Sequence, residues 1–197
     1  MNTPSVPPHP HPLLVDGFVT VRPWQPVDAG ALYAAADESL RAVTPWIPWL
    51  DSIRSMADSE RWIAESLDHW LWGTQFRFGI FAADDARPLL GGVGLNHLNT
   101  THRLANLGYW VRAAAVGRGI ATRATRLVAR FGLDNLGLGR IEIITATDNA
   151  PSHRVAEKAG AVFEGLQRNR LFMHGASIPA RMYSLVRSDL QEPARWG

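Results

Sequence analysis

The chain has 197 residues, which suits one domain, and 46% of them are apolar, enough for a full hydrophobic core. The formal net charge is only +2 and Lys158 is the single lysine, so no polybasic segment points to nucleic acid. The absence of cysteine excludes disulfides, thiolate metal ligands and a cysteine nucleophile.

The N-terminal stretch MNTPSVPPHPHP is rich in proline and predicts an extended tail over residues 1–12. A single domain over 13–190 and a short tail over 191–197 follow. His9 and His11 have no further ligands beside them, so we expect no metal site. The stretch lacks a signal-peptide pattern, and no apolar run approaches the roughly 18 residues of a membrane span. We therefore expect a cytoplasmic chain with no membrane contact.

The first elements are a strand over Val15–Arg22 and a helix that Asp28 caps at its N-terminus. The stretch TPWIPWL at 44–50 follows, and its two prolines exclude a long helix or a central strand. Its apolar residues leave two interpretations open. The stretch either packs over the core, or Trp46 and Trp49 form a wall of a binding groove.

The middle of the chain predicts one helix and three strands. The helix runs from Asp58 to about Trp72 and stops at Gly73. The alternation of apolar and polar residues and the turn signals between the runs predict strands. These strands cover Gln75–Ala82, Leu89–Asn96 and Leu104–Val111.

The second half contains the clearest helix. Its apolar residues lie on one continuous face, and it begins directly after Gly117-Arg118-Gly119. The β-rich run Arg140–Thr147 predicts a strand, and Asn149 and Gly160 bracket a short helix. The last predicted strands are Val162–Arg168 and Arg181–Val186. The order of elements indicates a mixed α/β sheet in one domain.

The glycine loop predicts a phosphate site, because a helix that begins at glycines presents unpaired N–H groups and the positive end of its dipole. Arg118 adds a charge. The alternative is a tight turn without a ligand. No Walker A match is present, and Thr122 stands where a dinucleotide fingerprint needs a third Gly or Ala.

At this point the sequence resembles the GNAT superfamily of acetyl-CoA-dependent N-acetyltransferases, whose motif Q/R-x-x-G-x-G/A matches residues 114–119 except at Ala114. Within it the chain is similar to the group that acetylates ribosomal-protein N-termini (RimJ/RimL-like). The ordered segments that carry the likeness span roughly residues 15–187. They are TPWIPWL, LGGVGLNHL, NLGYWV, GRGIATRA, TDNAPSHRVAEKAGAVFEG and RMYSLV.

The resemblance implies the GNAT fold and acetyl-CoA as co-substrate, with no metal. It also implies that the strand over Leu107–Val111 carries a bulge and splays from its neighbour, so that Trp110 and Val111 offer main-chain groups to the pantetheine arm. Asn149 would contact cofactor or substrate. The pyrophosphate would rest on the N–H groups of Gly117, Arg118, Gly119, Ile120, Ala121 and Thr122.

For catalysis the resemblance implies direct transfer, with Ser152, or a water, as the proton donor to the thiolate. Many relatives use a Tyr four residues further on, which is Ala156 here. Several relatives carry a Glu base where this chain has Asn106, which cannot take a proton. His97 is the nearest chemically suitable substitute, and an exposed strand-end histidine or a chain of waters are the alternatives.

The acceptor is left open between a protein N-terminus, a polyamine and other small amines. A free α-amine, with a pKa of about 7.7–8.0, is partly neutral at physiological pH, whereas a lysine needs roughly 4 kcal/mol of help. A site without a carboxylate base therefore favours α-amines. Two other functions remain: a non-catalytic acyl-CoA-binding domain, and an RNA-associated protein that uses Arg123, Arg126 and Arg130. Relatives are monomers or dimers, and the resemblance leaves a homodimer open.

Overall fold

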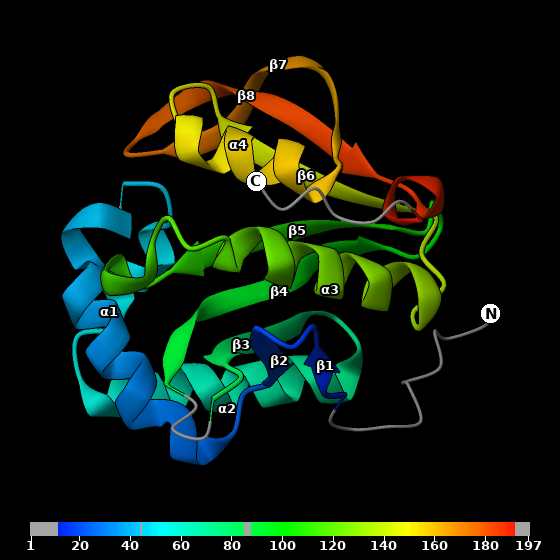
Figure 1. Cartoon of the computed structure of the whole chain (residues 1–197). Coiled ribbons are helices and arrows are strands. Elements are labelled where there is room, and N and C mark those ends of the chain that lie inside the picture. Colours follow the sequence, from blue (N-terminus) through cyan, green and yellow to red (C-terminus); the bar gives the residue numbers. More distant parts are fainter. Residues whose placement is uncertain (1–11, 44, 85–87, 192–197) are drawn as a thin grey trace.

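The computed structural model describes residues 12–43, 45–84 and 88–191, and in these ranges eight strands form one mixed sheet. The sheet order is β1-β2-β3-β4-β5-β6-β8-β7 (Figure 1); β5 and β6 are parallel, and the other neighbours are antiparallel. The strands are β1 (Leu14–Val15), β2 (Val19–Pro23), β3 (Phe76–Ala82), β4 (Leu89–Asn99), β5 (Leu104–Val111), β6 (Arg140–Ala146), β7 (Val162–Met173) and β8 (Ala176–Leu185). This is the mixed α/β fold that the sequence predicts.

Four α-helices accompany the sheet in the described residues. They are α1 (Ala29–Val43), α2 (Met56–Trp72), α3 (Ile120–Asp134) and α4 (Ala150–Ala159). Short 3-10 turns precede or follow them, namely η1 (Pro26–Asp28), η2 (Pro48–Ser52), η3 (Ala113–Ala115) and η4 (Arg187–Leu190). The predicted tails over 1–12 and 191–197 lie almost wholly outside the described residues, as do residues 85–87 between the strands predicted over Gln75–Ala82 and Leu89–Asn96.

Helix ends follow local capping chemistry. The α2 helix begins at Met56, two residues before the predicted start, because the Ser55 side chain accepts a hydrogen bond from the N–H of Asp58. It ends at Gly73, which adopts a left-handed conformation (φ 63°), and α4 likewise ends at Gly160 (φ 95°). Both glycine stops agree with the prediction.

The first predicted strand is interrupted. The prediction of one strand over Val15–Arg22 is wrong, because the chain turns at Asp16 and Gly17 between β1 and β2. The Asp16 Oδ1 accepts the N–H groups of Phe18 (3.0 Å) and Val19 (2.9 Å), and Gly17 has a φ of 85°. An Asx turn followed by a left-handed glycine therefore folds the segment into a hairpin.

Asp28 has a different role from the predicted helix cap. It ends the 3-10 turn before α1, and its carboxylate accepts the N–H of Gln25 (2.8 Å) and pairs with Arg22 through two hydrogen bonds of 2.7 Å. The Asp28 side chain is buried, so the ion pair compensates its charge. Arg22 also lies over the ring of Phe81.

The last two strands are longer than predicted. They form a hairpin that turns at His174 (φ 51°) and Gly175 (φ 79°), and β7 lies at the edge of the sheet. The register of β7 shifts twice along β8. The exposed, irregular run between 167 and 171 lacks alternation, and this is why the sequence predicts shorter strands.

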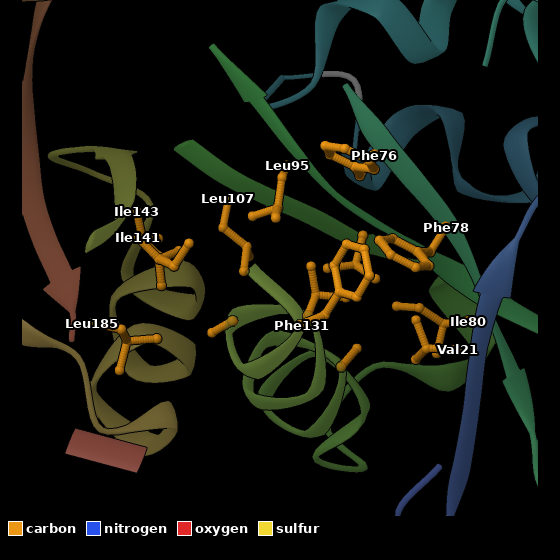
Figure 2. Close-up of a cluster of buried hydrophobic side chains, with 14 of the residues drawn as sticks. Val21, Phe76, Phe78, Ile80, Leu95, Leu107, Phe131, Ile141, Ile143 and Leu185 are labelled. Atoms are coloured by element: carbon orange, nitrogen blue, oxygen red, sulfur yellow. The ribbon is translucent and has the colours of Figure 1, made fainter. Parts of the chain in front are cut away.

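Two buried apolar clusters hold the layers together. In the larger one, α3 packs on the sheet through Phe131, whose ring lies 5.4 Å from that of Phe78 and 5.7 Å from that of Phe76 (Figure 2). Leu107 and Ile141 extend this cluster across β5 and β6. The smaller cluster joins α1, η2 and α2 to Trp110, Phe81 and Leu89 on the other face of the sheet.

The described residues contain no helix that is both long and apolar enough to cross a membrane. Within the same residues, no group of three or more His, Asp or Glu side chains is arranged to hold a metal ion.

Candidate active site

The central feature of the site is a splay between two parallel strands. The pairing of β5 with β6 covers only Leu104–Asn106 against Arg140–Glu142. Beyond that point β6 continues to Ala146 paired with β8 alone, so residues 107–111 of β5 have no partner on that side. We call this region, beyond Asn106 and Glu142, the β5–β6 splay. Its position is the one that the family resemblance implies.

The predicted bulge lies on a different strand. The register of β5 against β4 is continuous from Asn106 to Val111, whereas β4 is irregular between Asn96 and Asn99. His97 sits in this irregularity with a φ of 50°, and its side chain is exposed. The bulge is therefore on β4 and redirects His97 away from the regular pleat.

Main-chain groups of β5 point into the splay at alternate residues. The N–H of Arg112 donates to the carbonyl of Leu90, and hydrogen-bonded pairs alternate along an antiparallel ladder. The groups of Trp110 therefore face β4, and those of Tyr109 and Val111 face the splay. The Trp110 indole is buried against α1 and α2. Of the two residues predicted to offer main-chain groups to the pantetheine, Val111 faces the splay and Trp110 faces β4, and the groups of Tyr109 face the splay as well.

The glycine loop leads from β5 into α3. Gly117 and Gly119 have φ values of 82° and 72°, conformations that other residues adopt at a cost, and no side chain caps the helix. A Cβ at either glycine would meet open space, so the approach to the main chain is free. Ile120 and Thr122 are buried, whereas Arg118 is exposed. The N–H groups of the first helical turn are thus available to an anion.

A carboxylate on α1 fixes the start of this loop. Glu38 Oε1 accepts the N–H of Ala114 (2.8 Å), and its Oε2 accepts from Arg112 Nε (3.1 Å). The Ser39 hydroxyl accepts the N–H of Ala113 (3.0 Å). The hydrogen bond from Arg112 holds the pKa of the Glu38 carboxyl below its usual value. Ala114 occupies the motif position where relatives carry Gln or Arg, so Glu38 supplies an anchor that the motif residue lacks.

The start of α4 lies across the splay from β5. Asn149 Oδ1 accepts the N–H of Ser152 (3.1 Å), the helix cap that the sequence predicts. The Tyr109 hydroxyl lies 2.8 Å from Ser152 Oγ and donates to the Ser152 carbonyl at 3.0 Å. Burial raises the pKa of the Tyr109 hydroxyl, so it stays protonated. Sequence reasoning missed Tyr109, because this contact joins residues 43 positions apart.

Asn106 lies at the closed end of the splay. Its Nδ2 donates to Asn96 Oδ1 at 2.8 Å, and its own Oδ1 is buried without a partner among the described residues. His97 follows Asn96 in the chain, but its exposed side chain takes no part in this pair. The structure thus brings Asn106 and Ser152 to the splay and leaves His97 at its margin.

The loop that carries Trp46 meets the turn between β7 and β8. His174 Nε2 lies 3.0 Å from the carbonyl oxygen of Pro45, and Trp46 beside it is half-buried. The side chain of Trp49 lies outside the described residues. The contact shows that the loop and the hairpin meet, and the groove-wall role of Trp46 stays a prediction.

Comparison with known proteins agrees with this geometry. The protein YdaF of Bacillus subtilis (strain 168), whose name assigns it provisionally as a ribosomal N-acetyltransferase, is 28% identical over 178 residues, 89% of this chain and 94% of its own. The ribosomal-protein-serine acetyltransferase of Escherichia coli (strain K12) is 24% identical over 138 residues, 70% of this chain and 75% of its own.

Solved structures share the fold. The microcin C7 self-immunity acetyltransferase MccE, in complex with acetyl-CoA and AMP, superposes with a TM-score of 0.80 at 22% identity, over 87% of this chain and 93% of its own. The model of the acetyltransferase (GNAT) domain family matches residues 19–162. The chain therefore belongs to the GNAT family of acetyltransferases, as its motifs predict.

Proposed function

We propose that the chain is an acetyl-CoA-dependent N-acetyltransferase that acetylates a primary amine by direct transfer, with a protein N-terminal α-amine as its acceptor. The observation that carries this proposal is the β5–β6 splay, which leads directly to an uncapped helix N-terminus at a glycine loop. Together they offer an extended slot for a pantetheine arm and an anion site at its end.

The residues of the loop and the splay fit acetyl-CoA. The main-chain groups of Tyr109 and Val111 face the place of the pantetheine arm, and Asn149 orders the start of α4 beside it. When bound, acetyl-CoA supplies an activated acetyl thioester. The pyrophosphate would be held by the N–H groups of Gly117, Arg118, Gly119, Ile120, Ala121 and Thr122.

Ser152 is the proposed proton donor to the leaving sulfur. Its hydroxyl is half-buried at the N-terminus of α4, and Tyr109 holds it from across the splay. The N–H of Val111 faces the splay and would stabilise the developing negative charge on the acetyl oxygen. The exposed His97 and half-buried Trp46 are proposed only as groups at the acceptor entrance, together with Trp49, which is close to Trp46 in sequence.

Two observations support an α-amine on a protein as the acceptor. Asn106 stands where several relatives carry a carboxylate base, and a site without that base suits an amine that is already partly neutral at physiological pH. The name of YdaF includes the word ribosomal, and the name of the Escherichia coli relative refers to a serine of a ribosomal protein. A ribosomal-protein acceptor would place the chain in the cytoplasm.

The alternative of an RNA-associated protein loses its basis. Arg123 pairs with Asp16 at 2.8 Å and lies over the ring of Phe18. Arg126 is buried and donates a hydrogen bond to the carbonyl of Ala159 at the end of α4. Arg130 donates to the carbonyl of Leu190 at 2.7 Å. All three arginines thus have structural roles in place of a free cationic stripe.

Mass spectrometry of an acetylated peptide tests the proposal. The substrate is a peptide with a free N-terminal Ser and one internal Lys, incubated with acetyl-CoA, with spermidine in a parallel reaction. We expect acetylation at the α-amine. Acetylation mainly of the Lys side chain or of spermidine would contradict the proposed acceptor, and no product from any amine would favour a non-catalytic acyl-CoA-binding domain.

A further inference from the structure

We infer that the acceptor amine is received at the closed end of the splay by Asn106 and Glu142, and that Glu142 takes the proton that the missing family carboxylate would take. This inference rests on the proposed function and names the acceptor subsite within it. It assigns a base to a site in which Asn106 stands at the position of the expected carboxylate base.

The strand register places the two side chains together. Asn106 and Glu142 are Cα partners in the last pair that joins β5 to β6. The preceding pair, Ala105 and Ile141, faces the core, so the next pair points to the opposite face of the sheet. Asn96 lies on that same face, since it accepts a hydrogen bond from Asn106. A carboxylate thus stands one strand away from the position where relatives carry theirs.

The amide of Asn106 leaves an acceptor facing β6. Its Nδ2 is turned toward Asn96 on β4, so its Oδ1 lies on the other side of the planar amide, away from β4, and β6 pairs with β5 on that side. That oxygen is buried and has no partner in the described part of the chain. A buried carbonyl oxygen without a donor is costly, and a neighbouring carboxylate only accepts. Two adjacent acceptors call for a donor with several N–H groups, and a primary ammonium is such a donor.

Glu142 keeps an oxygen for this role. Arg140 Nε donates to Glu142 Oε1 at 3.0 Å, while the two terminal nitrogens of Arg140 both bind Glu164. Hydrogen bonds from Arg140 and from Ser184 lower the pKa of Glu164 to about 2. Glu164 is therefore the main partner of the guanidinium. The second oxygen of Glu142 has no hydrogen bond among the described residues.

Open space lies beside the pair. Gly108 follows Asn106 on the same face of β5, and a Cβ built on it meets no atom within 4 Å. Gly108 has no positive φ, so the absence of a side chain is not a requirement of the backbone here. The missing side chain leaves a hollow between Asn106 and Trp110, through which an amine can reach the splay.

The chemical step balances with one proton taken and one returned. The ammonium gives a proton to the Glu142 carboxylate and becomes a neutral amine, whose nitrogen forms a bond to the acetyl carbon. The carbon–sulfur bond breaks, and the sulfur takes a proton through Ser152 as the nitrogen loses its second one. The products are the acetylated amine and the free thiol, and Glu142 releases its proton to water. The ammonium of an α-amine, with a pKa of about 7.7–8.0, gives up its proton more readily than that of a lysine, so the step again suits an α-amine.

The test compares two substitutions, each of which removes one negative charge from the carboxylates that bind Arg140. We expect Glu142→Gln to lower kcat/KM for the Ser-peptide at least about 100-fold, the lower limit for general base catalysis. Its affinity for acetyl-CoA, measured by calorimetry, should be unchanged. Glu164→Gln, on β7 and two strands further from the splay than Glu142, should lower kcat/KM no more than a few-fold. Adding Asn106→Asp to Glu142→Gln should restore activity, because it returns a carboxylate to the family position.

Gly108→Val is a second, independent variant. It fills the hollow without backbone strain, so it should raise KM for the peptide at least tenfold and leave acetyl-CoA binding intact. Retained activity in both Glu142→Gln and Gly108→Val would overturn the inference, and so would equal losses in Glu142→Gln and Glu164→Gln without rescue. A wild-type chain that binds acetyl-CoA but acetylates no amine would instead overturn the proposed function.

Discussion

The contact between Tyr109 and Ser152 allows a quantitative prediction. Tyr109→Phe removes one hydroxyl and keeps the ring, so no cavity forms in the surrounding core. The lost group lies 2.8 Å from Ser152 Oγ and 3.0 Å from the Ser152 carbonyl. A buried hydrogen bond of this kind contributes about 1 kcal/mol to stability, so Tm should fall by about 2–4 °C.

The effect on turnover should be larger than the effect on binding. Ser152 loses the partner that holds its hydroxyl, and an ordering free energy of about 1.4 kcal/mol corresponds to a tenfold change in rate. We therefore expect kcat to fall about tenfold. The calorimetric Kd for acetyl-CoA should stay within about twofold, because the variant keeps every main-chain group of β5. Tyr109 is in this sense a positioning residue for Ser152.

A double-mutant cycle tests this dependence. The assay follows release of the free thiol from acetyl-CoA with the Ser-peptide as acceptor. Ser152→Ala should lower kcat more than Tyr109→Phe, and the double variant should equal Ser152→Ala, since Tyr109 acts only through Ser152. If the two losses multiply in the double variant, or if Tyr109→Phe keeps wild-type kcat, the reasoning is refuted.

Three further predictions concern the loop and the Arg140 network. Gly117→Ala should cost about 1–2 kcal/mol in urea unfolding, because its φ of 82° is left-handed and its surroundings are open; no loss would contradict the conformational argument. Glu38→Ala should raise the Kd for acetyl-CoA about fivefold in calorimetry, because the glycine loop loses the carboxylate that holds the N–H of Ala114. An unchanged Kd would show that Glu38 does not order the loop for binding. Glu164→Gln should destabilise the chain by about 1 kcal/mol at pH 6, after allowance for its exposure. Because the Glu164 pKa falls from 4.5 to about 2 on folding, this difference should disappear as the pH drops from about 4.5 toward 2. A difference that persists in acid would refute the assignment.

Short-range signals made much of this fold predictable. The glycine loop, the apolar face of α3 and the caps at Asn149 and Gly160 all depend on residues within one or two turns, and each was found where the sequence places it. The hairpin at Asp16 was missed because a single Asx turn interrupts an otherwise strand-like run. Such a turn depends on one side chain and leaves the apolar pattern intact.

The site was only partly predictable. The resemblance placed Asn106 and Ser152 at the splay, but Tyr109, Glu38 and Glu142 entered only with the structure. Each of these acts on a residue that is distant in sequence, through strand register or helix packing. Sequence periodicity assigns a residue to a face, whereas the partner across the sheet depends on which strands pair. The homodimer stays a prediction, and light scattering after size exclusion tests it.

Calorimetric titration with acetyl-CoA tests the central claim most directly. We expect saturable binding near one molecule per chain, and its loss in Gly119→Glu, which places a carboxylate at the proposed pyrophosphate site in the open space beside Gly119. Gly175→Glu in the β7–β8 turn is the matched control, since that glycine also has a positive φ and open surroundings. No binding at millimolar acetyl-CoA, or equal binding by Gly119→Glu, would contradict the account.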